Sequence, residues 1–327
     1  MDKRLQIGLG AGLAAALVVA APHCAAQSAV AYPTKPVRLI VASGAGGGLD
    51  FVARQVAVPL SEALGQAVVV DNRAGASGSI AAEVSSQAAP DGYTLMFLSA
   101  SLVVYGIVNK TRYDLYCDFA PVTQAAAAPY MLTVHPGLPV QTVKELIAYA
   151  KANPAKLNYA STGNASLAHL AGELFGIATG TQLVHIPYKG VGAGLTDMLS
   201  GRVQMSFLSA GSVYAQVRTQ KLKAIAIASA TRAKMAPDLP TMVESGVPGF
   251  VVTQWHGMLA PRGTPRPVIE RLHREVVKAV QRPEVAARLA LDGTEGIASS
   301  PQEFAAHLRS EREQWAKVVK QANIRGD

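Results

Sequence analysis

One pattern of strand, turn and helix recurs along the chain and limits what it can fold into. Short apolar runs lie at 37–42, 67–72, 93–99, 156–160, 182–188, 203–209 and 222–229. Most lead into a turn with Gly, Ser or Asn and then a segment of helical period. Apolar strands that alternate with helices indicate parallel sheets covered on both faces. At least seven strands in 327 residues favour two lobes. We therefore expect an α/β fold with two lobes, each a mostly parallel sheet with helices on both faces.

Two stretches without clear helical period are interpreted as the crossings between the lobes. These are an irregular connection at 121–139 and a proline-rich stretch at 237–267. They predict a first lobe from 27–130 with 246–327, and a second lobe from 131–245.

The C-terminal segment predicts a helix that packs on the first lobe. It begins at Ser300 and Pro301, a typical cap and first turn. Its apolar side chains share one helical face; they are Phe304, Leu308, Trp315 and Val319.

The N-terminus has the plan of a secretory signal peptide. Lys3 and Arg4 precede an uncharged stretch from 7 to 21, which is followed by small residues. This stretch is shorter than the roughly 20 residues that span a bilayer. We expect a signal peptide at 1–26, with cleavage after Ala26 or Ala31, and a soluble exported protein. The mature chain then keeps Cys117 alone, which excludes an intrachain disulfide.

The net charge of +8 favours anionic partners by long-range attraction. The basic residues are spread along helical segments rather than gathered in a stripe with aromatic residues. A nucleic-acid partner is therefore not expected.

The glycines after the first strand raise the possibility of a dinucleotide site. The fingerprint needs a third glycine where Leu49 stands, and the cluster at 190–194 fails in the same way. Neither has the Gly-Lys-Ser/Thr of a phosphate loop. Asp71, placed where a ribose-binding acid would lie, is interpreted as a turn cap. We expect no cofactor.

Two turns nonetheless have the physical properties of an anion site. A strand that ends in such a turn and enters a helix leaves N–H groups unpaired at the positive end of the helix dipole. The alternative is that the glycines only make turns and the hydroxyls only cap helices. The candidate ligand-binding residues are Ser43, Gly44, Ala45, Gly46, Gly47 and Gly48 in the first loop, and Ser161, Thr162, Gly163, Asn164, Ala165 and Ser166 in the second.

Catalytic and metal sites find little support in the sequence. It has none of the common serine, cysteine or zinc hydrolase motifs, and it names no nucleophile with a base beside it. His169 and Glu173 are spaced to share a helix face, which favours an ordinary contact over a metal site. His185, inside an apolar strand, is expected to be a hydrogen-bonded core or hinge residue. We expect no enzyme and no metal.

Tyr188 is the candidate in the segment HIPYKG, where it offers a ring and a hydroxyl beside the cation of Lys189. The alternative is a rigid surface turn. Trp255 and His256 could likewise form a ligand wall or ordinary packing.

The order of motifs resembles that of the tripartite tricarboxylate transporter substrate-binding proteins, the TctC or Bug family. The resemblance runs from about Tyr32 to the C-terminus through YPTKPVRLIVASGAGGGLD, GQAVVVDNRAGASGSIAAE, KLNYASTGNASLAHLAGELF, HIPYKG, LTDMLSGRVQMSF and WHGMLAPRGTP. It implies a periplasmic receptor with two lobes that close on a small organic carboxylate, such as a di- or tricarboxylate or an aromatic acid. It also implies that the loops at 43–48 and 161–166 hold one carboxylate, and that membrane permease subunits receive the ligand.

Two departures from the family pattern bear on the ligand. The usual apolar triplet before the glycines is replaced by Ala42, Ser43 and Gly44. An acidic residue common after the strand at 203–207 is absent, and Ser209 stands in that stretch. This argues against a ligand with an ammonium group and adds Ser209 to the candidate ligand contacts. We expect a monomeric receptor for a plain carboxylic acid. A sensory receptor and, less favoured, a secreted hydrolase stay open as alternatives.

Overall fold

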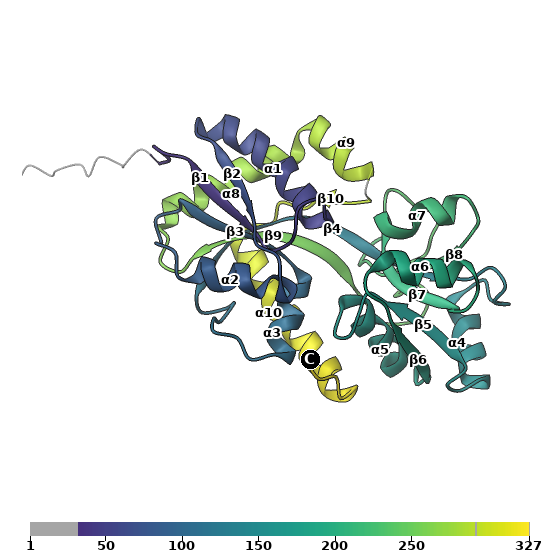
Figure 1. Ribbon diagram of the computed structural model, residues 1–327. Coiled ribbons are helices and arrows are strands. Elements are labelled where there is room, and N and C mark those ends of the chain that lie inside the picture. The colour runs from purple at the N-terminus through teal and green to yellow at the C-terminus, as the bar shows by residue number, and fades with distance from the viewer. Residues whose placement is uncertain (1–31, 292, 327) are drawn as a thin grey trace, which may run out of the picture. The chain divides into compact units, whose positions relative to one another are not determined.

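The computed structural model describes residues 32–291 and 293–326 (Figure 1). The expected signal peptide at 1–26 lies outside the described residues. Within the described part of the chain, no helix is long and apolar enough to span a membrane.

The first sheet is built around β1 (Val37–Val41), whose residues are almost all buried. It runs parallel to β2 (Val68–Asn72) and β3 (Thr94–Ser99) on its two sides. β9 (Thr253–Pro261) is antiparallel to β3, and β4 (Phe119–Val134) is antiparallel to β9. The short β10 (Glu295–Gly296) also pairs with β4.

The second sheet is built around β5 (Leu157–Ser161), which is parallel to β6 (Leu183–Pro187) and β7 (Met205–Ser209). β7 and β8 (Lys223–Ile227) are both antiparallel to the end of β4. The seven strands predicted from the apolar runs are therefore all present, and the expected two-lobed α/β class is confirmed.

β4 passes from one sheet to the other. Pro129 pairs with Thr253 of the first sheet, and the next residue, Tyr130, pairs with Ser209 of the second. The prediction of an irregular connection at 121–139 is wrong, because β4 is a strand of 16 residues. Its run of alanines is buried, and backbone pairing with the neighbouring strands overrides the weak strand preference of alanine. The predicted lobe boundaries remain a proposal; the change of sheet falls at residues 129–130.

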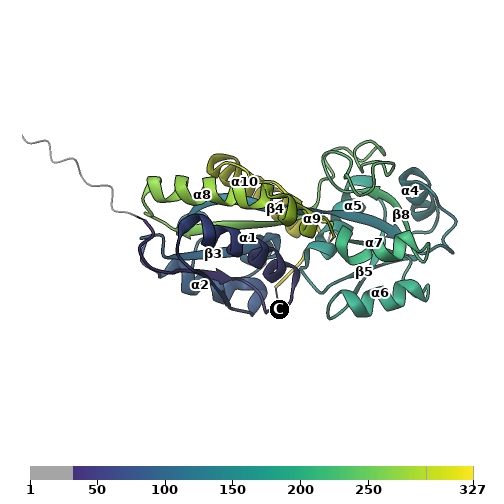
Figure 2. The same ribbon diagram turned by 90° about the horizontal axis from the view of Figure 1, so that it is seen from above.

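Helices cover both faces of each sheet (Figures 1 and 2). On the first sheet, α1, α8 and α9 pack together on one face, and α2, α3 and α10 lie on the other. On the second sheet, α5 packs against β5 to β7, while α6 contacts β5 and α7 contacts β4 and β7. Their bounds are α1 Gly48–Leu64, α2 Ser79–Ser86, α3 Ala100–Val108, α4 Val143–Ala152, α5 Leu167–Thr179, α6 Val191–Leu199, α7 Ala210–Arg218, α8 Arg266–Gln281, α9 Pro283–Leu291 and α10 Pro301–Gln321, with a short 3₁₀ turn, η1, at Ala76–Gly78.

The C-terminal helix α10 begins as predicted, with Ser300 as a capping box partner of Glu303. Three of its predicted apolar contacts are buried: Phe304, Leu308 and Trp315. The fourth is wrong by one position, because Val318 is buried and Val319 is only half-buried.

Candidate functional site

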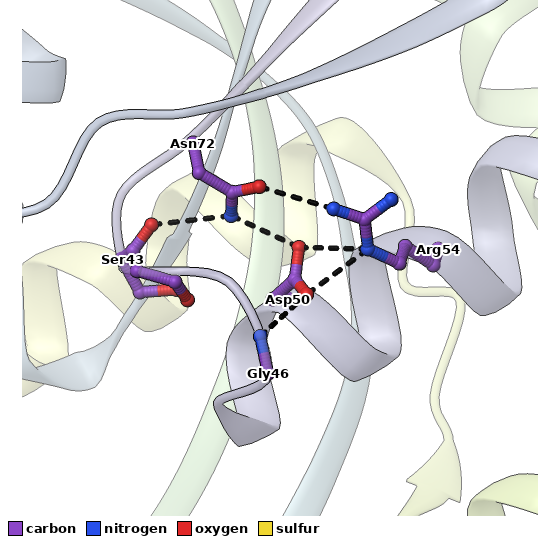
Figure 3. Close-up of polar contacts among 6 residues, drawn as sticks. Ser43, Gly46, Asp50, Arg54 and Asn72 are labelled. Carbon is purple, nitrogen blue, oxygen red and sulfur yellow. Dashed lines mark hydrogen bonds and ion pairs between the residues drawn. The ribbon is translucent and has the colours of Figure 1, made fainter.

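The first candidate loop connects the buried end of β1 to the first turn of α1. Its glycines are exposed, while Asp50 behind them is only 3% exposed. Figure 3 shows how Asp50 holds the loop. It accepts a hydrogen bond of 2.8 Å from the Gly46 N–H and one of 2.9 Å from the Asn72 amide, which also donates to the Ser43 carbonyl. The chain thus supplies its own carboxylate to this turn.

Asp50 is ionised in this network. Burial raises its pKa, but hydrogen bonds from Arg54, Gly46 and Asn72 outweigh burial and hold the pKa below its ordinary value. Arg54 Nε lies 3.0 Å from both carboxylate oxygens.

The first loop keeps donors that the network does not use. Among the described residues, the N–H groups of Gly48 and Leu49 have no acceptor. The hydroxyl of Ser43 donates to the Gly44 carbonyl at 3.3 Å. Gly46, Gly47 and Gly48 line a pocket of about 440 Å³, together with Phe51, Arg288 and Leu291.

The second candidate loop connects β5 to α5, and its two serines are used within the loop. Ser161 is 2% exposed, donates to the Gly163 carbonyl at 2.9 Å and lies 2.6 Å from His185 Nε2. Ser166 accepts from the His169 N–H, so it is a helix cap, as the alternative interpretation had it. Thr162 and Asn164 are different, because their side chains have no hydrogen-bond partner among the described residues.

A stacked pair of histidines lies against the second loop. The rings of His169 and His185 are 3.7 Å apart and nearly parallel, and Tyr159 lies 5.0 Å from His185. His169 Nδ1 accepts the Ala165 N–H at 3.1 Å. Burial lowers the pKa of both histidines to about 4. Both rings are therefore neutral at pH 7, so the loop's own residues attract an anion through N–H and amide dipoles rather than through a histidinium.

Ser161 and His185 form a serine–histidine contact that the sequence did not reveal. They lie on neighbouring parallel strands, β5 and β6, and only strand register brings them together. The hydroxyl is buried and committed to the Gly163 carbonyl, which is not the exposed position that a nucleophile needs. The hydrogen-bonded role expected for His185 is present. Within the described residues, no cluster of three His, Cys, Asp or Glu could hold a metal ion.

Three other predicted residues have their polar groups engaged elsewhere. The hydroxyl of Tyr188 donates to Asp197 at 2.8 Å, and its ring packs in an apolar cluster on the α6 side. Ser209 Oγ lies 2.7 Å from Ser212 Oγ at the start of α7. Asp71 does not cap a turn; its carboxylate accepts from the side chains of Arg38 and Arg73.

The two candidate loops line different cavities. Asn164 and Ala165 of the second loop face a cavity of about 230 Å³. Its other walls come from the turn after β2, the end of α3 and the C-terminal segment. These walls were missed, although the turn after β2 repeats the signal of a glycine turn between strand and helix. The lining residues outside the second loop are Ala76, Ser77, Tyr105, Val108, Asn109, Arg325 and Gly326.

Two α/β sheets that share a crossing strand, with donor-rich turns after β1 and β5, define the class of two-lobed solute-binding proteins. The sequence model of the tripartite tricarboxylate transporter family receptors, TctC, matches residues 52–324. The chain belongs to this family of periplasmic binding proteins.

Similar proteins agree with this assignment. Protein BugT of Bordetella pertussis (strain Tohama I) is 35% identical, over 94% of this chain and 95% of BugT. The solved structure of R. palustris Rpa4515 with adipate is 34% identical, with a TM-score of 0.76, and the match covers 90% of this chain and 99% of that one. MatC from Rhodopseudomonas palustris with bound malate is 30% identical, with a TM-score of 0.72, over 88% of this chain and 100% of MatC.

Proposed function

We propose that this protein is a periplasmic receptor that captures a small organic carboxylate and delivers it to the membrane permease subunits of a tripartite tricarboxylate transporter. The observation that carries the proposal is the second loop. In this loop, which leads into the N-terminus of α5, the side chains of Thr162 and Asn164 have no hydrogen-bond partner among the described residues, and Asn164 lines a cavity. Similar proteins with adipate and malate support a carboxylate as the ligand.

Carboxylate capture follows from what these loops can donate. N–H and amide groups at a helix N-terminus form charge-assisted hydrogen bonds with a carboxylate, and these bonds gain strength where water is excluded. The first loop offers Gly48 and Leu49, and the second offers Thr162 and Asn164. The buried Ser161 hydroxyl shapes the second loop instead of contacting the ligand.

If the two lobes close on the ligand, the ligand would contact both candidate loops. They belong to different sheets and line different cavities, so a ligand held by both ties one sheet to the other. Such a ligand stabilises a closed state by its additional contacts there. We propose that the protein acts as a monomer and performs no chemistry on its ligand.

A ligand screen tests the proposal. We would strip the mature protein of ligand by refolding and measure thermal shifts with dicarboxylates, tricarboxylates, aromatic acids, acidic amino acids and neutral sugars. A ligand at 100 times its Kd stabilises by about 2.7 kcal/mol, a shift of several degrees. A shift with one class of acid is expected; a shift with sugars alone would contradict carboxylate capture.

Gly47 provides a matched pair of variants for the first loop. Its φ of −82° suits any residue, and an added Cβ would lie 3.7 Å from the nearest atom, the Gly44 carbonyl oxygen. Gly47→Asp sets a carboxylate at the N-cap of α1, where it takes the free N–H groups and stabilises the helix. We expect Gly47→Asp to fold well and lose binding, and Gly47→Ala to bind as before. Equal affinity in both variants would remove the first loop from the site.

A further inference from the structure

The cavity beside the second loop has one charged side chain in its lining, that of Arg325. Within the described part of the chain, its guanidinium group forms no ion pair and no hydrogen bond. The remaining polar lining groups are the neutral side chains of Ser77, Tyr105, Asn109 and Asn164. The cavity therefore favours an anion, and the cation lies on the C-terminal segment rather than on the candidate loop.

The C-terminal segment is fixed against α3. After α10 ends, the Ile324 N–H donates to the Val319 carbonyl at 3.0 Å, and Asn323 turns the chain with a φ of 50°. Gly326 then lies against the end of α3, where an added Cβ would be 2.4 Å from Asn109 Oδ1 and 2.8 Å from the Val108 carbonyl oxygen. Only glycine permits this approach, and it keeps Arg325 at the cavity.

Backbone strain is concentrated around the same cavity. Ala76, Ser77 and Ala165 have φ values of 46°, 51° and 53°, in the left-handed region that non-glycine residues avoid. Among the described residues only seven non-glycine positions have positive φ, and these three all line this cavity. Such strain persists where the surrounding structure imposes it, and it gathers at binding sites. This separates the cavity from an incidental gap between helices.

We propose that Arg325 binds the second carboxylate of a compact dicarboxylate whose first carboxylate is held by the loop at 161–166. This inference rests on the proposed function and adds the substrate class. The volume of about 230 Å³ suits a small ligand rather than a drug-sized one. A guanidinium fork matches a carboxylate in two parallel hydrogen bonds, and Val108 and Ala76 offer apolar surface to a methylene chain.

Matched ligand pairs test the role of Arg325. Isothermal titration would compare succinate with butyrate and adipate with hexanoate, pairs that differ by the second carboxylate. The variants are Arg325→Gln, Arg325→Lys and the control Arg309→Gln, an exposed residue of α10 away from the cavity. We expect Arg325→Gln to lose about 10- to 100-fold in affinity for the diacid while its affinity for the monoacid stays within about threefold. The affinity of Arg325→Lys for the diacid should lie between those of the wild type and Arg325→Gln, and the affinity of Arg309→Gln should equal that of the wild type.

Three outcomes would overturn the inference in distinguishable ways. In the first outcome, the wild type binds diacids, and Arg325→Gln either binds them equally well or loses affinity by the same factor for the diacid and the monoacid of a pair. Arg325 then does not recognise the second carboxylate, while carboxylate capture still stands. If the wild type binds neither diacid but the ligand screen shows a shift with another class of acid, this inference fails and carboxylate capture stands. If no acid in the screen or the titration binds, both this inference and the proposed function fail. Unchanged melting temperatures of the ligand-free variants would exclude misfolding as the cause of lost affinity.

Discussion

His256 makes the stability of this protein depend on pH in a way that can be measured. It lies on β9 with 5% of its surface exposed, and Nδ1 has no hydrogen-bond partner in the described part of the chain. Burial lowers its pKa from 6.5 to about 4, because the charged form would lose its hydration without gaining a partner. The folded protein therefore keeps this ring neutral over a range in which the unfolded chain takes up a proton.

The sign and size of the effect follow from that difference. Below pH 6.5 the unfolded state binds more protons than the folded state, so stability falls as pH decreases from 6.5 toward 4. At pH 5 the pH lies about 1.5 units below the pKa of His256 in the unfolded chain, so that ring is protonated there. In the folded protein the ring is still mostly neutral at pH 5. At about 1.4 kcal/mol per pH unit, His256 alone removes about 2 kcal/mol of unfolding free energy between pH 7 and pH 5.

Urea unfolding at the two pH values would measure this loss in the wild type and in His256→Gln. Glutamine does not titrate, so the decrease in unfolding free energy from pH 7 to pH 5 should be smaller by about 2 kcal/mol in the variant. Taking the difference between the two proteins cancels the other titrating groups that they share. A decrease of the same size in both would refute the reasoning, since it would mean that His256 is protonated without cost in the folded state.

Two further pairs of variants test the packing that positions the site. Gly257→Ala places a Cβ 2.2 Å from a ring atom of Phe304 and should lower the unfolding free energy by about 1–3 kcal/mol. In the same melting assay, Gly106→Ala on α3 should raise the unfolding free energy by up to about 1 kcal/mol, because its added Cβ meets no atom within 4 Å. Glu311→Ala leaves two buried indole N–H groups without their shared acceptor and should lower the unfolding free energy, measured with urea, by about 2–4 kcal/mol. The control Glu313→Ala, at an exposed position, should change it by no more than about 0.5 kcal/mol. Equal effects of the two substitutions would contradict the role of the Glu311 carboxylate.

Local patterns predicted most of the fold. The strands at 37–41 and 157–161 are apolar and end in turns that only a few residue types can make, so their position can be seen without knowing their neighbours. β4 could not be recognised in this way. Its run of alanines between Pro121 and Pro129 has weak strand preference, and only pairing with β9, β7 and β8 makes it a strand.

The difference between local patterns and long-range contacts also explains which features of the two candidate loops the sequence revealed. The donors of Gly48 and Thr162 are a property of a strand, a turn and a helix, and the sequence shows all three. The engagement of Ser161 with His185 and of Tyr188 with Asp197 depends on partners from other elements, which the sequence does not place.

The cavity is assembled from long-range contacts, and this bears on which property of the ligand each part controls. In the proposed mode of binding, the loop at 161–166 donates to the carboxylate that all the acids share, so substitutions in the loop should weaken the binding of all of them alike. Arg325 reaches the cavity only because α10 crosses to α3 and Gly326 lies against Asn109. A group brought in by the tertiary fold can recognise the far end of the ligand, which the turn cannot reach. In the proposed mode of binding, the local sequence of the loop therefore accounts for the charge of the ligand, and the C-terminal segment accounts for its second carboxylate.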